Sequence, residues 1–191
     1  DTAGLLHYAR ARLHVTAGEL SLAARELALA RDHWQNAGNR RGVVRSALGE
    51  SQLLAMQGDW EAAETILVDA ITTLGADVTG EDALLSLDLR QNLATLYSYQ
   101  DRHREALEVI GAVHIALSVL LETASDEDIP NLEERLGLVE RDLALAYTFL
   151  DQPQRAEQAL ASAIARLTRV PAIADRGRAR TNLAHLLART G

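Results

Sequence analysis

Residues 143–163 read LALAYTFLDQPQRAEQALASA, and this stretch decides the fold because its small residues recur along the chain at the same spacing. Ala144, Ala156 and Ala163 lie 12 and then 7 residues apart. The same two steps occur at Ala11, Ala23 and Ala30, at Ser51, Ala63 and Ala70, and at Ala94, Ala106 and Val113, and a fifth copy begins at Ala184. We call the three positions of each copy its first, second and third rung. Ten of the twelve rungs in the four complete copies are Ala, which is typical of repeated helix pairs because small side chains let two helices cross closely.

The residues around the rungs follow helical spacing. Leu143-Ala144-x-x-Tyr147 places its apolar residues on one helical face, and Leu93-Ala94-x-x-Tyr97 does the same. A short polar turn follows the first helix of each copy, at residues 17–19, 57–59, 101–103 and 151–153. Gly18 suits the left-handed end of a helix, and Pro153 suits the first turn of the next one. The second helix of each copy then carries the second and third rungs.

Each copy thus has three parts: Leu-small-x-x-Tyr, then a turn with Gly or Asp, then Ala followed by a large and another small apolar residue. This pattern resembles the tetratricopeptide repeat (TPR). This resemblance implies an all-α fold, a right-handed superhelix (α-solenoid) of antiparallel helix pairs, with one TPR-like domain over residues 1–191. The repeats would occupy residues 4–35, 40–74, 82–123 and 131–168, with a partial repeat at 173–191. We expect nine helices, at 4–17, 20–35, 40–56, 59–74, 82–100, 103–123, 131–150, 153–168 and 173–189. Corresponding rungs lie 40, 43 and 50 residues apart, whereas a standard TPR has about 34 residues. Repeats of this greater length resemble those of maltose-regulator-like bacterial transcription regulators.

Composition excludes several kinds of chemistry. The chain has no Cys, which excludes disulfides, thiolate metal sites and thiol nucleophiles. All 19 basic residues are Arg, so the lysines of phosphate-binding loops, pyridoxal enzymes and kinases are missing. The net charge of -8 opposes nucleic-acid binding or attachment to an anionic membrane, and no apolar run is long enough to span a bilayer. We expect no cofactor and no metal, and we expect a bacterial protein located in the cytoplasm.

Partners of TPR proteins usually lie in the concave groove, against outward residues of the first helices. By register this implies Tyr8, Arg12 and Val15; Arg45, Gln52 and Met56; Asp88, Gln91, Thr95 and Tyr99; Arg141, Leu145 and Phe149; and Thr181, His185 and Arg189. Four of these form a cationic series, Arg12, Arg45, Arg141 and Arg189, that would grip a carboxylate or a phosphate. The alternative is that each Arg is solvated or paired with a neighbouring carboxylate.

Other polar residues favour structural roles. His7 and His14 share one helical face, but zinc sites on helices more often use four-residue spacing, so packing is the stronger interpretation. Asp126-Glu127-Asp128 and Glu133-Glu134 precede or begin a helix, where acids complement the helix dipole and Ser125 or Asp128 would cap. Arg166, Arg169 and the arginines of 176–180 make a basic stretch that we interpret as solvated or as a contact with a following segment. Trp34 and Trp60 are expected to seal junctions between repeats.

These observations favour a non-enzymatic interaction module with a protein or peptide partner in the groove of a larger bacterial regulator. The alternative is a domain that senses a small molecule or a peptide within a multidomain transcriptional regulator. An enzyme is disfavoured because no catalytic constellation is visible. Asp1 is not an initiator Met and the last repeat is cut, so we expect a piece of a longer protein. Leu183, Leu186 and Leu187 would lack a covering helix, which predicts self-association through that end.

Overall fold

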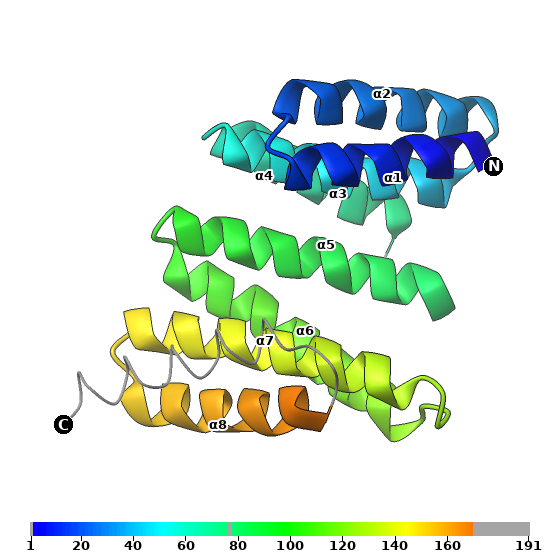
Figure 1. The fold of residues 1–191 in the computed structure, drawn as a ribbon. Helices are drawn as coiled ribbons and strands as arrows, with labels where there is room; N and C mark the ends of the chain where they lie inside the picture. Colours follow the sequence, from blue (N-terminus) through cyan, green and yellow to red (C-terminus); the bar gives the residue numbers. More distant parts are fainter. Residues whose placement is uncertain (1, 76–77, 170–191) are drawn as a thin grey trace. The chain divides into compact units, whose positions relative to one another are not determined.

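The computed structural model describes residues 2–75 and 78–169, and these residues form eight α-helices and no strand (Figure 1). The helices are α1 (Thr2–Thr16), α2 (Leu20–Asn36), α3 (Arg40–Met56), α4 (Trp60–Leu74), α5 (Gly80–Tyr99), α6 (His103–Glu122), α7 (Ile129–Phe149) and α8 (Pro153–Arg169). Each of these eight helices lies within a few residues of its predicted bounds. The ninth predicted helix, at 173–189, falls outside the described residues.

The chain divides into two compact units, residues 1–96 and 97–191, and each is described by itself. In the first unit α1 packs on α2, α2 on α3 and α3 on α4. In the second unit α7 packs on both α6 and α8. The single domain over residues 1–191 therefore stays a prediction. None of the helices in the described ranges is long and apolar enough to cross a bilayer.

The predicted ladder forms the core of both units. All twelve rungs of the four complete copies are buried, with at most 5% of any of them exposed. Each second helix also buries a large residue four positions and eleven positions after its second rung, so α2, α4, α6 and α8 bury the same four positions. These residues are Ala23, Leu27, Ala30 and Trp34; Ala63, Leu67, Ala70 and Leu74; Ala106, Ile110, Val113 and Leu117; and Ala156, Leu160, Ala163 and Leu167. Small residues at two of the four positions bring the neighbouring helices close to the second helix, which is the geometry predicted from the spacing.

The turn inside each helix pair has the same backbone conformation in all four copies. The seventh residue after the first rung is left-handed, with φ of 76° at Gly18, 83° at Gly58, 59° at Asp101 and 56° at Asp151. The next amide then donates to the carbonyl five residues earlier at 2.9 Å, from Glu19 to His14, Asp59 to Leu54, Arg102 to Tyr97 and Gln152 to Tyr147. This hydrogen bond is that of the Schellman motif, and it reverses the chain after the first helix.

Trp34 joins the first two repeats, as predicted for this residue. Its ring is almost fully buried at the end of α2. A Cβ atom on Gly4 would lie 2.5 Å from the indole, and a Cβ atom on Gly42 would lie 2.3 Å from it. The two glycines therefore make room for the ring on α1 and on α3.

The predicted cap on α7 differs in detail, because the Ser125 hydroxyl bonds the Asp128 carboxylate at 2.6 Å and no side chain caps this helix.

Candidate functional site

A groove of about 760 Å³ lies between α1 and α3 in the first unit. Its lining comes from three helices: Tyr8, Ala9, Ala11, Arg12, Leu13, Val15 and Thr16 of α1, Leu27 of α2, and Leu48, Gly49 and Gln52 of α3. Tyr8, Arg12, Val15 and Gln52 are residues that the repeat register assigned to a binding surface. The structure thus brings four predicted site residues together in one groove.

Packing below the groove explains why its floor is apolar. The first two rungs, Ala11 and Ala23, form a buried cluster with Leu27 and Leu53, and Tyr8 packs against that cluster. Gly49 lets α3 lie close to α2, since a Cβ atom there would be 2.8 Å from Leu27. Because these residues are held by the core of the repeat, the floor of the groove is formed before any partner binds.

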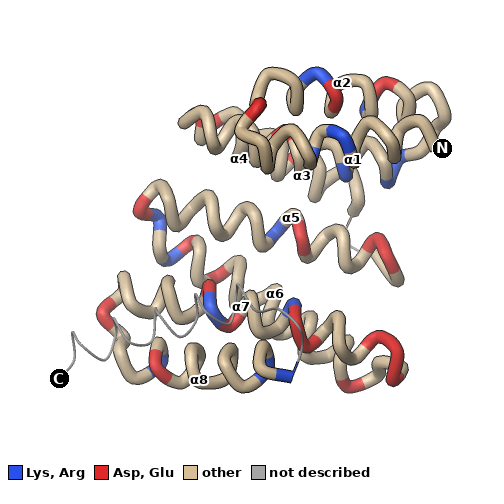
Figure 2. Tube along the Cα trace, in the orientation of Figure 1, with Lys and Arg blue, Asp and Glu red and all other residues tan. Residues whose placement is uncertain are grey.

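Charge at the edge of the groove is positive on the α1 side. The helix Thr2–Thr16 contains Arg10 and Arg12 and no acidic residue, so α1 carries blue positions and no red one in Figure 2. Neither Arg12 nor Arg45 forms an ion pair with any residue in the described ranges. Unpaired guanidinium groups beside an apolar floor can bind a carboxylate or a phosphate in two-point contacts.

Tyr8 supplies a neutral hydroxyl at the same place. Burial raises the pKa of its phenol above the ordinary value, while the nearby Arg12 and Arg45 partly offset this effect. The phenol therefore stays protonated at neutral pH and can both donate and accept a hydrogen bond. The Tyr8 ring also contacts Trp34, with centroids 5.8 Å apart and a 50° tilt, which fixes its orientation.

Gln52 connects this groove to α5, and the remaining predicted site residues of the first unit do not line the groove. Gln52 at its edge donates through Nε2 to Asn92 Oδ1 of α5 at 3.0 Å. On α5, Thr95 donates to the Gln91 carbonyl at 3.0 Å, and neither residue lines the groove. The charge of Asp88 raises the pKa of the Tyr8 phenol. Met56 is exposed at the end of α3.

The predicted site residues of the second unit include three exposed apolar or aromatic side chains, Tyr99, Leu145 and Phe149. Phe149 at the end of α7 is 55% exposed and stacks on His103 of α6, with centroids 4.2 Å apart and planes within 4°. Leu145, one turn earlier, is also exposed, as is Tyr99. Arg141 bonds the Asp142 carboxylate at 2.9 Å, which agrees with the paired alternative for this member of the cationic series. Thr181, His185 and Arg189, like the C-terminal leucines of the predicted self-association, lie outside the described residues.

The histidines of α1 have separate carboxylate partners. His7 Nδ1 lies 2.8 Å from Glu26 Oε2, and the His7 ring stacks on His33 with centroids 5.3 Å apart. His14 Nδ1 lies 2.6 Å from Glu19 Oε2. Within residues 2–75 and 78–169, no three His, Asp or Glu side chains are arranged to hold a metal ion. His7 therefore packs against α2, whereas His14 forms an exposed contact with the turn that follows α1.

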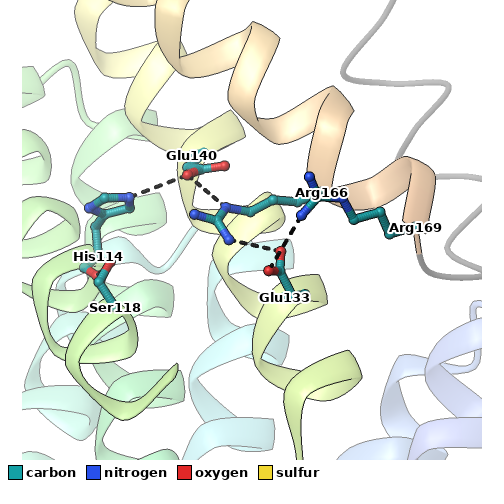
Figure 3. A network of polar contacts seen from close by, with 6 residues as sticks. All are labelled: His114, Ser118, Glu133, Glu140, Arg166 and Arg169. Carbon is teal, nitrogen blue, oxygen red and sulfur yellow. Dashed lines mark hydrogen bonds and ion pairs between the residues drawn. The ribbon is translucent and has the colours of Figure 1, made fainter. Parts of the chain in front are cut away.

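Sequence reasoning missed a buried ion-pair network in the second unit (Figure 3). Arg166 of α8 bonds Glu133 at 2.8 Å and Glu140 at 3.0 Å, both on α7. His114 of α6 approaches the same Glu140 oxygen at 3.4 Å, and Arg169 lies 3.7 Å from Glu133. The interpretation of Arg166 as a solvated residue is wrong, because its guanidinium bonds two carboxylates of α7.

Glu140 is the centre of this network, with only 5% of its side chain exposed. Burial alone would raise the pKa of its carboxyl, but hydrogen bonds from His114, Ser162 and Arg166 bring that pKa below its ordinary value. The same contacts raise the pKa of Arg166 against the effect of its own burial. The network thus fixes how α6, α7 and α8 pack, and its charges are neutralised within the unit. No catalytic role follows from it.

Comparison with known proteins identifies the fold. No protein-family model matches the sequence, and neither does any curated protein sequence. Among solved structures, the chain is similar to BtubC (BKLC) from P. vanneervenii, with 23% identity, a TM-score of 0.64, and coverage of 100% of this chain and 68% of that one. It is also similar to a putative kinesin light chain with nearly identical TPR-like repeats from Podosopora anserina, with 18% identity, a TM-score of 0.68, and coverage of 94% and 83%.

A further similar structure is MamA, residue 41 to the end, from Desulfovibrio magneticus RS-1, with 14% identity, a TM-score of 0.55, and coverage of 98% and 95%. These similarities establish the fold: the chain has an all-α, TPR-like helical-repeat fold. The predicted repeat resemblance is confirmed at this level. The narrower similarity to maltose-regulator-like transcription regulators stays a prediction.

Proposed function

We propose that this chain is a non-enzymatic interaction module that binds a peptide segment of a partner protein in the groove between α1 and α3. An apolar side chain of the peptide lies on the floor formed by Ala11, Leu27 and Gly49. A carboxylate or phosphate next to it bonds Arg12 and Arg45. The observation that carries the proposal is an apolar groove lined by Arg12, with the charge of Arg45 acting on Tyr8 in the same groove, while neither arginine forms an ion pair within the described residues.

Recognition of this kind needs little rearrangement of the protein. The floor residues belong to the buried core of the repeat, and Tyr8 is oriented by Trp34. A preformed surface loses less conformational entropy on binding than a flexible one, so more of the contact energy appears as affinity. The Tyr8 hydroxyl, which stays protonated, can bond the peptide backbone or an acidic side chain.

The test is selection of random 12-residue peptides on the whole chain, followed by fluorescence anisotropy with the selected peptides. We expect sequences with an acidic residue close to a large apolar one. Arg12→Gln together with Arg45→Gln should weaken their binding at least tenfold, because a hydrogen bond to a charged group contributes about 1.5–3 kcal/mol. Arg25→Gln, an exposed arginine of α2, is the matched control and should leave binding unchanged.

Two results would contradict this proposal. One is a library that yields no peptide enriched for acidic and apolar residues. The other is selected peptides that bind the double variant as tightly as the original chain while its circular dichroism and melting temperature are unchanged.

A second candidate is a sensor that binds a small molecule in the same groove and belongs to a cytoplasmic bacterial transcription regulator. The volume of about 760 Å³ favours it, because small-molecule sites usually occupy about 300–1,000 Å³. The full-length sequence of the parent reading frame distinguishes the two functions. A DNA-binding helix-turn-helix in the same reading frame would favour the sensor, and a frame with repeats alone would favour the peptide-binding module. A thermal-shift screen of small metabolites against this chain is the direct test.

A further inference from the structure

The helix α6 in the second unit has apolar residues on two opposite sides. Its buried side consists of Ala106, Ile110, Val113 and Leu117. Ile115 and Val119 lie on the other side of the helix, and they are 66% and 56% exposed. Residues 109–121 include no Asp, Glu, Lys or Arg, so the helix is apolar almost all round. A helix of this composition is normally covered on more than one side.

The same side of the other second helices is polar or small. The positions nine and thirteen residues after the second rung, which Ile115 and Val119 occupy in α6, are exposed wherever the structure describes them. These positions hold Asp32 and Asn36 in α2, Thr72 in α4, and Ala165 and Arg169 in α8. No helix of the described repeats therefore covers this side in any copy. The exposure of Ile115 and Val119 is thus not explained by packing between repeats.

Gly111 adds open space on the same side of α6, one turn before Ile115. At the other glycines inside described helices, an added Cβ atom would lie within 2.8 Å of a Trp or Leu side chain of the chain itself; these are Gly4, Gly42, Gly49 and Gly137. At Gly111 an added Cβ atom would meet nothing within 4 Å. A glycine in a helix interior destabilises the helix, and it leaves the backbone open to close approach by another helix. Gly111 and the exposed Ala112, Ile115 and Val119 form an apolar surface that we call the α6 strip.

The α6 strip has the spacing of a coiled-coil seam. Ala112, Ile115 and Val119 follow one another at three and four residues, and the exposed Glu108 and Glu122 continue this spacing at the two ends. Residues at such positions contact the apolar residues of one partner helix that lies along them. The strip is therefore suited to a helix and not to an extended peptide.

Charge decides what kind of helix fits the α6 strip. Neither Glu108 nor Glu122 forms an ion pair with a described residue, and Arg104, the one arginine of α6, lies a turn beyond Glu108. The connection between α6 and α7 adds three exposed acidic residues at 126–128, and it is red in Figure 2. Two copies of the strip would bring these glutamates together in a parallel or an antiparallel arrangement, which is unfavourable. A helix with basic residues two heptads apart would instead place a cation beside each glutamate.

We infer that the α6 strip docks a basic amphipathic helix of a partner protein, whose apolar residues lie on the strip and whose Lys or Arg side chains bind Glu108 and Glu122. This interaction goes beyond the proposed peptide groove. The groove belongs to the first unit and would bind through Arg12 and Arg45, whereas the strip belongs to the second unit and binds through carboxylates. The two surfaces thus select partners of opposite charge.

The probe is a fluorescein-labelled helical peptide of three heptads, with Leu at positions a and d, Lys at e and g, and Gln or Ala elsewhere. Its matched peptide has Glu in place of Lys. Fluorescence anisotropy with the whole chain measures both dissociation constants. We expect the Lys peptide to bind at least tenfold more tightly than the Glu peptide, because like charges oppose docking. Ile115→Gln together with Val119→Gln should weaken binding of the Lys peptide at least tenfold, since two large apolar side chains then lose their burial.

Further variants separate docking from folding. Glu108→Gln with Glu122→Gln should weaken binding about two- to fivefold, in the range of exposed ion pairs. Gly111→Leu should prevent binding without lowering the melting temperature, because the space that it fills is open within the described residues. Val68→Gln, at an exposed residue of α4, is the control and should leave binding unchanged. Ile110→Gln, on the buried side of α6, should lower the melting temperature strongly.

Three outcomes would overturn the inference. One is a Lys peptide that does not bind, or that binds no more tightly than the Glu peptide. Another is binding that survives the double variant of Ile115 and Val119, because the peptide would then lie elsewhere on this acidic chain. The third is a dimer in sedimentation that the same double variant abolishes, which would identify a second copy as the occupant. None of these results involves Arg12 or Arg45, so the groove proposal is tested independently.

Discussion

Arg166→Met is expected to destabilise the second unit by about 3 kcal/mol at pH 7. Arg166 is the cation that bonds both Glu133 and Glu140, and only 5% of the Glu140 side chain is exposed. Breaking a buried pair from one side typically costs about 3–5 kcal/mol, because the remaining charge is desolvated without compensation. We take the lower end because Arg166 itself is 24% exposed and His114 still faces Glu140.

The double variant Glu140→Met with Arg166→Met distinguishes this explanation from simple loss of packing. It removes both the buried carboxylate and its main cation, and apolar replacement of such a pair is often neutral. Glu133 keeps its contact with Arg169. We therefore expect the double variant to lie within about 1 kcal/mol of the original chain, with a coupling energy of at least about 2 kcal/mol between the two sites.

Urea unfolding with two probes can assign the effect to the right unit. Both tryptophans, Trp34 and Trp60, belong to the first unit, so their fluorescence reports on residues 1–96, while circular dichroism at 222 nm reports on all helices. Arg166→Met should shift the dichroism transition more than the fluorescence transition. Arg155→Met, an exposed arginine of the same helix, is the control and should change stability by about 0.5 kcal/mol or less. A loss below about 1 kcal/mol for Arg166→Met, or a double variant as unstable as the sum of its parts, would refute the reasoning.

Three further predictions concern the same elements. Glu140→Gln should lower the stability of the chain at pH 7 but not in acid. The pKa of Glu140 is lower in the folded state than the unfolded value of 4.5, so the ionised carboxylate stabilises the fold above pH 4.5 and loses this effect as the pH falls through the folded-state pKa. Urea midpoints measured from pH 7 downward should therefore converge with those of the original chain, and a constant gap would contradict this. Gly42→Ala should cost about 1–3 kcal/mol by pushing on Trp34, whereas Gly111→Ala on α6, whose added Cβ meets nothing within 4 Å, should stabilise by about 0.5–1 kcal/mol. Asp101→Gly and Asp151→Gly should each raise stability by about 0.5–1 kcal/mol in thermal unfolding, because both residues have a positive φ that glycine adopts more readily; a lower melting temperature would mean that these carboxylates stabilise the turn.

The repeat could be predicted from sequence because its signal lies in residue size and in spacing along the chain. Burial of Ala23, Leu27 and Ala30 requires no knowledge of distant contacts, since a helix with small residues on one face must pack that face closely. The turn positions could also be predicted, because Gly18 and Gly58 are residues that favour a left-handed backbone conformation at the end of a helix. Asp101 and Asp151 adopt the same conformation without the glycine and were found only through register.

The ion-pair network could not be predicted because its members are far apart in sequence and typical of a solvated surface. Glu140 and Arg166 are separated by 26 residues and lie on different helices. Their contact depends on how α7 and α8 face one another, which spacing does not specify. The groove is an intermediate case. Register identified Tyr8, Arg12 and Gln52, whereas Leu48 and Gly49 depend on how closely α3 approaches α2.

The position of Trp34 also limits how this array can be duplicated or rearranged in evolution. Its ring needs a glycine nine residues before the first rung of the following helix, and Gly42 is that residue for Ser51. A tandem copy of the first helix pair would place Trp34 against Thr2, which holds the same position before Ala11. The fit of Trp34 with Gly42 therefore belongs to the junction between two helix pairs and not to either pair alone. Exchange of segments cut at the polar turns would keep every rung and still break this fit.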